Sequence, residues 1–332
     1  MRNSSIELLR IVSILMIISM HVLGVNFMDS TTIIDKEFVI FINSFCNAGV
    51  TIFVLISGFY GIRFKKDKLF YMANQTWFYS ILLFGIGYLV FSSFSTDSLL
   101  RSLFPIVTNK YWFISSYIVL YVVSPYFNSV LDGLSKKNYV TLLFFLITVF
   151  IIAPTFLKFE LTHDGGKGPV NMILAYMTGY YFKRFDFPTL IQKYSVIILI
   201  LSFFAVFGLS SLLSYHSEQI SKAFFRDNGL FIFMIAVSML YLFSTKNFYN
   251  MTINNIAKLT LGVYLVQETL KLWIPKFTSN IFIYWISSVL ALYLLSLLIE
   301  FVRMRLCDSI FKRLSCWEVS ITSKVLQRIT RI

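Results

Sequence analysis

The feature that most constrains this chain is a series of long apolar stretches, each close to the length that an α-helix needs to cross a bilayer. A spanning helix takes about 20 apolar residues, and somewhat fewer where the bilayer is thinned. The 332 residues are 57% hydrophobic and 14% charged, whereas a soluble protein has roughly 25% charged residues. The predicted spans are 6–25, 38–60, 74–94, 111–130, 139–157, 169–182, 195–213, 229–243, 256–270 and 281–302. The sequence therefore predicts an all-α, polytopic membrane protein of about ten transmembrane helices.

The second of these spans contains a polar interruption formed by Asn43, Ser44, Asn47 and Gly49. Broken helices occur at membrane depth only where protein or a water-filled cavity satisfies the freed backbone groups. We therefore expect this span to be broken and to lie inside the bundle.

The basic residues are distributed unevenly between the two sides of the predicted membrane. With the N-terminus inside, 20 of the 29 Lys and Arg residues fall in cytoplasmic segments and nine in outer loops. This asymmetry follows the positive-inside rule and places both termini in the cytoplasm. The net charge of +13 is thereby explained without a nucleic-acid partner.

The chain divides into a transmembrane domain, residues 1–302, and a basic cytoplasmic tail, residues 303–332. Apolar residues recur at helical spacing from Ile310 to Ile329, with Lys and Arg elsewhere on the helix. Such a helix is expected to lie on the anionic inner leaflet, and binding to a partner protein is the alternative. The three cysteines, Cys46, Cys307 and Cys316, form neither a disulfide framework nor a metal-ligand set, so no metal is predicted.

Two ionisable residues in the first span, Arg10 and His21, are the strongest functional signal in the sequence. They are 11 residues apart, so they share one helix face and are separated by roughly 16 Å along the axis. Ionisable groups are costly in a bilayer and usually mark a functional pathway. The alternative is a snorkelling arginine with a hydrogen-bonded histidine. His163 and His216 fall in outer loops, where we expect them to be bystanders.

A second signal lies at the end of the second span, where Ser57 and Gly58 precede Arg63. Small residues permit close helix approach. Arg63 is predicted to reach the same membrane face as Arg10, and guanidinium groups match phosphate oxygens well. The two arginines are candidate ligands for a phosphorylated substrate. The alternative is that they only contribute to the excess of basic residues on the cytoplasmic side.

Four segments, in order along the chain, resemble the family-3 integral-membrane acyltransferases. RNSSIELLRIVSILMIISMH (2–21) is similar to the family's opening helix, with its basic residue and histidine at Arg10 and His21 and its acid at Glu7. FVLISGFYGIR (53–63) resembles the Ser-Gly-Phe signature followed by arginine. YWFISSYIVLYVVSP (111–125), with Trp112, and LTLGVYLVQE (259–268), with Tyr264, resemble two later helices.

Two positions depart from the family pattern. Tyr117 stands where one branch has a glutamate, and Gln267, followed by Glu268, stands where the late motif usually ends in histidine. These differences put any role carried over to that region in doubt. The chain also shows no appended esterase-like domain, so we expect it to act alone.

The resemblance implies transfer of an acyl group from cytoplasmic acyl-CoA, a co-substrate rather than a bound cofactor, to a hydroxyl of an extracytoplasmic glycan. Acetyl is favoured over succinyl, and the acceptor is expected to be a capsule, exopolysaccharide or other envelope glycan of a bacterial plasma membrane. His21 would be the general base, and Arg10 and Arg63 would bind the donor. Ser57 is favoured as a packing residue over an acyl relay. The expected supporting residues are Glu7, Ser57, Trp112, Tyr264 and Glu268.

The competing class is a transporter or flippase for lipid-linked sugars, in which Arg10 and His21 would contact a diphosphate and a proton. A glycan polymerase is a third option, for which a long outer loop would be expected. Membrane lipids and polysaccharide-assembly proteins are the further partners that this interpretation suggests. Release of free thiol from acetyl-CoA distinguishes the enzyme from the transporter.

Overall fold

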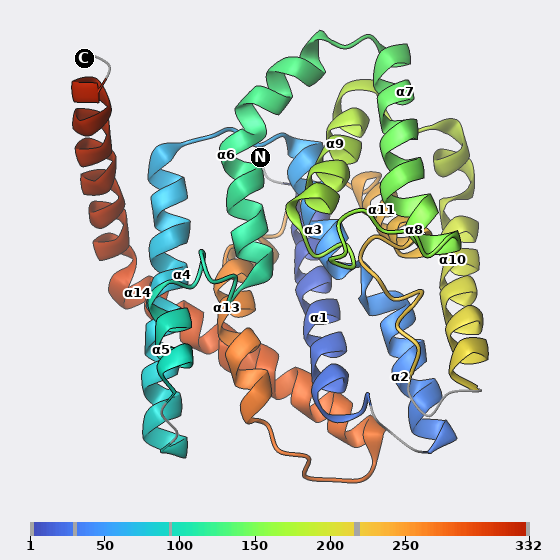
Figure 1. Ribbon diagram of the computed structural model, residues 1–332, viewed down its shortest axis with the longest axis horizontal. Helices are drawn as coiled ribbons and strands as arrows, with labels where there is room; N and C mark the ends of the chain where they lie inside the picture. Colours follow the sequence, from blue (N-terminus) through green and yellow to red (C-terminus); the bar gives the residue numbers. More distant parts are fainter. Residues whose placement is uncertain (1–2, 29–31, 93–94, 216–219, 330–332) are drawn as a thin grey trace.

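The structure is a computed structural model that describes residues 3–28, 32–92, 95–215 and 220–329. These residues form an all-helical bundle with no β-strand among them (Figure 1). The elements in chain order are α1 (Ser4–Asn26), α2 (Ile33–Cys46), α3 (Ala48–Tyr60), α4 (Lys66–Phe91), α5 (Thr96–Leu103), α6 (Trp112–Gly133), α7 (Lys136–Ile147), the π-helix η1 (Thr148–Ile152), α8 (Ala153–Phe156), α9 (Pro169–Phe185), α10 (Thr189–Tyr215), α11 (Leu230–Ser244), α12 (Met251–Ala257), α13 (Thr260–Leu270), the 3₁₀-helix η2 (Lys271–Trp273) and α14 (Ile281–Ile329).

Six helical segments of the described chain are long and apolar enough to cross a membrane. They are 4–25, 33–60, 112–133, 136–156, 189–215 and 281–324. Four other predicted spans correspond to α4, which is 26 residues long but less apolar, and to the shorter helices α9, α11 and α13. The shorter helices are largely buried among their neighbours, so the protein itself, rather than lipid, surrounds much of their length.

The interruption predicted in the second span is present. Helix α2 ends at Cys46, and α3 begins at Ala48 after Asn47. The side chain of Asn47 donates to the backbone carbonyl of Asn43 at 2.7 Å. The same carbonyl also accepts the backbone N–H of Asn47 at 3.2 Å, so helical hydrogen bonding is kept across this short interruption.

The predicted span 256–270 is wrong as a single helix. It is divided into the end of α12 and the whole of α13 by Lys258 and Leu259. The backbone N–H of Leu259 donates to the carbonyl of Ile256 at 2.9 Å. This tightened turn ends α12, and the chain then restarts as α13 at Thr260.

Helix α14 continues from the last predicted span through the tail, for 49 residues in all. The boundary predicted at residue 302 therefore falls inside a helix. In Figure 1 the orange first part of α14 crosses the bundle obliquely, and the red second part runs beside α4. Tail residues contact α4 directly, since Asn74 donates to Glu318 at 2.8 Å and the rings of Phe78 and Phe311 are 5.5 Å apart. Ile310, Trp317 and Ile321 stay exposed, which leaves the tail an apolar face.

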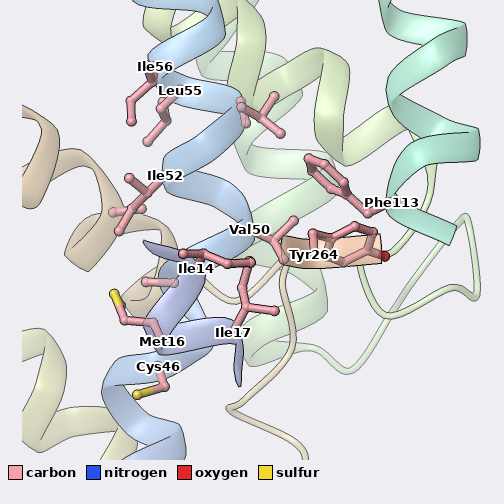
Figure 2. Packing of buried hydrophobic residues seen from close by; sticks show 14 of the residues in the cluster. Ile14, Met16, Ile17, Cys46, Val50, Ile52, Leu55, Ile56, Phe113 and Tyr264 are labelled. Carbon is pink, nitrogen blue, oxygen red and sulfur yellow. The ribbon is translucent and has the colours of Figure 1, made fainter. Parts of the chain in front are cut away.

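The centre of the bundle is formed by α1 and α3. Figure 2 shows Ile14 and Ile17 of α1 beside Val50 and Ile52 of α3. Close packing of such side chains gains van der Waals contacts and fixes α1, which carries both Arg10 and His21, within the bundle.

Helices α3 and α9 make a close backbone contact through two glycines. A Cβ at Gly58 would collide with the backbone carbonyl of Tyr176, and one at Gly179 would collide with that of Leu55. Only glycine allows backbones to approach this closely. The glycine of the Ser-Gly-Phe signature therefore has a packing role, which was expected from the sequence.

Candidate active site

The first of two cavities along α1 contains Arg10, and we call it the Arg10 cavity. Its volume is about 340 Å³. It is bounded by α1, α3, α4, α6, α13 and α14 and by the α12–α13 turn. The polar residues that line it are Arg10, Ser57, Lys68, Tyr71, Gln75, Tyr117, Lys258, Thr260, Tyr264, Glu300 and Arg303. With four basic residues and one acid, this cavity favours an anionic ligand.

The basic residues of the Arg10 cavity lie at different depths. Lys68 and Lys258 are exposed. Arg10 has 27% of its side chain exposed, with Nη1 3.5 Å from Oε2 of the buried Glu7. Arg303 is only 4% exposed. Exposed lysines thus surround a more enclosed interior that holds two arginines.

Ser57 and Tyr117 meet across the Arg10 cavity. The Ser57 hydroxyl donates to the carbonyl of Phe53 at 3.0 Å, and its oxygen lies 3.2 Å from the Tyr117 hydroxyl. No base lies beside Ser57 in the described residues that would activate it as a nucleophile. This arrangement favours the packing role expected for Ser57. It also gives Tyr117, where a family branch has glutamate, a hydrogen-bonding role.

The second cavity, the His21 cavity, follows the first along α1 and has a volume of about 490 Å³. Two loops, 164–167 and 222–227, form its far wall. The residues that line it are Met20, His21, Gly24, Val25, Met28, Asn43, Asn47, Trp112, Asp164, Gly165, Lys167, Lys222, Phe225, Arg226, Asp227, Glu268 and Lys271. The break between α2 and α3 therefore borders a cavity, as the sequence predicts.

His21 is held by the end of α13. Its Nδ1 lies 3.2 Å from Oε1 of Gln267 and 3.4 Å from Oε2 of Glu268. The Gln267 amide nitrogen donates to Glu268 at 3.2 Å, so its oxygen is the atom that faces the ring. Both neighbours of Nδ1 are acceptors, which favours the Nδ1–H tautomer and leaves Nε2 as the basic nitrogen.

Glu268 is itself paired. Lys271 donates to its Oε1 at 2.6 Å. The carboxylate thus lies between the imidazole and an ammonium group. Gln267 and Glu268 together orient His21, which assigns a structural task to the departure at the late motif.

A thin partition separates the two cavities. Ile17, Phe113 and Tyr264 line the Arg10 cavity, while other residues of the same three helices line the His21 cavity: Met20, His21, Trp112 and Glu268. The rings of Phe113 and Tyr264 are 5.3 Å apart in an edge-on arrangement, and Figure 2 shows them side by side. Arg10 and His21 consequently share a helix but lie on opposite sides of an aromatic partition.

One predicted site residue, Arg63, lies apart from these cavities, as does His163, the other histidine that the structure describes. Arg63 is exposed between α3 and α4 and is not among the residues that line either cavity. His163 is exposed in a loop, and His216 lies outside the described residues. Of the supporting residues, Ser57 and Tyr264 line the Arg10 cavity, Trp112 and Glu268 line the His21 cavity, and Glu7 contacts Arg10.

Several residues of the site were not singled out from the sequence. They are Lys258, Glu300 and Arg303 in the Arg10 cavity, and Asp227 in the loop wall of the His21 cavity. Glu300 and Arg303 carried a usable signal, since two charges three residues apart adjoin a long apolar run. Arg303 was instead counted with the basic tail.

An all-helical bundle with several apolar spans, and with Arg10 and His21 in two adjoining cavities along α1, has the architecture of a multi-pass membrane protein. The comparison with protein families identifies the kind of reaction. Residues 3–302 match the family model described as "Acyltransferase domain", that of acyltransferase family 3. The chain belongs to this family and is a membrane acyltransferase. Neither a search of curated proteins nor a search of solved structures found a match.

Proposed function

We propose that this protein is an O-acyltransferase that moves an acyl group, with acetyl favoured, from cytoplasmic acyl-CoA to a sugar hydroxyl of a bacterial envelope glycan. The observation that supports this most is the placement of Arg10 and His21 in two cavities that adjoin on α1. One cavity offers cations to a polyanionic donor. The other offers an imidazole to a neutral hydroxyl.

The donor would enter the Arg10 cavity from the cytoplasm. Lys68 and Lys258 are exposed where the cavity meets solvent, so they are placed to attract the phosphates of coenzyme A. Arg10 would hold one of these phosphates or the adjoining part of the chain. The acyl thioester would then lie toward the aromatic partition.

The acceptor would enter the His21 cavity from the opposite side. Trp112 supplies an aromatic surface, and Asn43, Asn47 and Asp227 supply polar groups suited to sugar hydroxyls. Nε2 of His21 would take the hydroxyl proton as the oxygen attacks the thioester carbonyl carbon. The carbon–sulfur bond then breaks, and the imidazolium returns the proton to the departing thiolate.

Purified protein in detergent tests this function. Free thiol should appear from acetyl-CoA when a soluble envelope oligosaccharide is supplied. His21→Ala and His21→Gln should lower this rate by about 10² to 10⁴, the usual loss of a general base, while CoA binding persists. His163→Asn is the control, since His163 is exposed and its positive φ of 52° suits asparagine. Full activity in His21→Ala would reject the base assignment, and a wild-type protein without thiol release would reject acyl transfer from CoA.

A further inference from the structure

A buried ion pair between Glu300 and Arg303 lines the Arg10 cavity. Nε and Nη2 of Arg303 donate to the two oxygens of Glu300 at 2.8 and 2.7 Å. The pair is 1% and 4% exposed respectively. A buried ion pair is costly to desolvate, so the polar atoms that the pair itself does not use need further hydrogen bonds.

The carboxylate of Glu300 is fully engaged. Besides the two bonds from Arg303, it accepts from Gln75 at 3.1 Å and from Tyr79 at 2.6 Å. A Cβ at Gly262 would collide with this carboxylate. The glycine of the LTLGVYLVQE segment therefore makes room for Glu300, which fixes the pair between α4, α13 and α14.

Arg303 is hydrogen-bonded through Nε and Nη2, and its guanidinium lies 5.1 Å from the centre of the Phe311 ring. Its Nη2 also donates to the Tyr71 hydroxyl at 3.1 Å. Nη1, however, is buried and has no hydrogen-bond partner among the described residues. Two of the five N–H donors of the guanidinium are therefore unused, in a residue that lines the cavity. An unsatisfied buried donor is costly and calls for a ligand or water.

The charge of the pair indicates what kind of group this donor suits. Glu300 neutralises Arg303, so Nη1 presents hydrogen-bond donors without net charge. The proposed phosphate ligands are other residues, the exposed Lys68 and Lys258 together with Arg10. A neutral carbonyl oxygen is the acceptor that matches a neutralised and enclosed donor.

We propose that Nη1 of Arg303 binds a carbonyl oxygen of the pantetheine arm of acyl-CoA, deeper in the cavity than the phosphates. This assignment rests on the proposed use of acyl-CoA. The pair then positions the arm so that its thioester end faces the partition formed by Ile17, Phe113 and Tyr264.

The test compares two ligands, coenzyme A and adenosine 3′,5′-bisphosphate, which lacks the pantetheine arm. The double variant Glu300→Gln/Arg303→Gln removes both charges together. It should bind coenzyme A about ten-fold or more weakly and bind the bisphosphate as the wild type does. Lys258→Gln should weaken both ligands. Arg305→Gln, an exposed arginine on the same helix, should change neither.

The outcomes separate this inference from the function on which it rests. A wild-type protein that does not bind coenzyme A would reject the donor, whatever Arg303 does. Coenzyme A binding that the double variant leaves unchanged would make the pair purely structural. Equal losses for both ligands would place Arg303 at the phosphates and overturn the carbonyl contact. If the bisphosphate does not compete at all, the phosphate assignment of the lysines fails, and coenzyme A affinity alone decides the role of Arg303.

A folding defect is checked by thermal unfolding of each variant. Should the double variant not fold, Arg303→Lys serves instead, because it keeps the charge opposite Glu300 but loses the planar fork. It should also weaken coenzyme A and leave the bisphosphate unaffected. Retention of wild-type coenzyme A affinity in a folded Arg303→Lys protein would contradict the proposal.

Discussion

Nδ1 of His21 lies 3.2 Å from Oε1 of Gln267, a residue 246 positions further along the chain. The amide of Gln267 is held in turn by Glu268. This contact joins α1 to α13 at the proposed reaction centre. It directs one imidazole nitrogen at a fixed acceptor and leaves the other for chemistry.

Gln267→Ala should therefore reduce turnover by about 10- to 100-fold, as removal of the outer hydrogen-bond partner does for a metal-binding histidine. Coenzyme A affinity should be unchanged, because Gln267 does not line the Arg10 cavity. Steady-state thiol release and calorimetric coenzyme A binding measure the two effects. Gln192→Ala, at an exposed glutamine, is the control. Equal loss of donor affinity and turnover would contradict a role confined to orienting His21.

Arg10 and Arg63 should differ in their effects on donor binding. The sequence favours both as phosphate ligands, but only Arg10 lines the cavity. Arg10→Ala should weaken coenzyme A by about 1.5–3 kcal/mol, typical of hydrogen bonds to charged groups. Arg63→Ala should cost clearly less, since its exposed charge is screened by solvent. Isothermal calorimetry measures the coenzyme A affinity of both variants. If Arg63→Ala loses more affinity than Arg10→Ala, the phosphates bind at the α3–α4 segment instead.

Gly58→Ala should destabilise the bundle, because its new methyl group collides with the backbone carbonyl of Tyr176. A backbone atom cannot move aside by a change of side-chain rotamer. Overpacking of this kind costs about 1–3 kcal/mol. Gly208→Ala on α10 is the matched control, since no atom lies within 4 Å of its Cβ position, and alanine there should be neutral or gain up to about 1 kcal/mol. Thermal unfolding in detergent compares them. Equal stability in both variants would refute the close contact between α3 and α9.

Asp227 predicts a pH effect on stability. Burial raises the pKa of this loop carboxyl to about 7 from its ordinary 3.8, with Lys167 opposing the shift and Asp164 adding to it. The folded state thus favours the neutral acid. The stability that this group contributes is complete below pH 3.8 and is lost as the pH rises toward 7, by about 4 kcal/mol at most.

The Asp227→Asn variant should lose this dependence and be more stable than the wild type at about pH 8. Melting temperatures across the range measure the difference. Asp97→Asn, at an exposed carboxylate, should follow the wild-type curve. A parallel pH dependence in Asp227→Asn would show that another group is responsible.

The sequence predicted those parts of the site that depend on one helix. Arg10 and His21 share α1, and their periodicity alone placed them on a common face. The polar residues around Asn47 predicted a break because backbone groups in a bilayer must be satisfied locally.

The remaining features depend on contacts between distant segments. The family resemblance marks Gln267 as a departure, but nothing in the surrounding residues identifies it as the partner of His21. The unused donor of Arg303 becomes visible only when Tyr71, Gln75 and Glu300 surround it. The turn at Lys258 was missed because residues 256–270 are apolar enough to suggest one span, and hydropathy does not report where a helix restarts.

The partition of Ile17, Phe113 and Tyr264 has an electrical consequence. In the proposed orientation, the Arg10 cavity would open to one side of the membrane and the His21 cavity to the other. If both are filled with water, most of the membrane voltage falls across the partition between them. An acetyl group carries no charge and would cross the field without electrical work. A succinyl group carries a carboxylate, on which a potential of 100 mV does about 2.3 kcal/mol of work. Turnover in polarised vesicles would thus be indifferent to voltage for one acyl group and sensitive to it for the other.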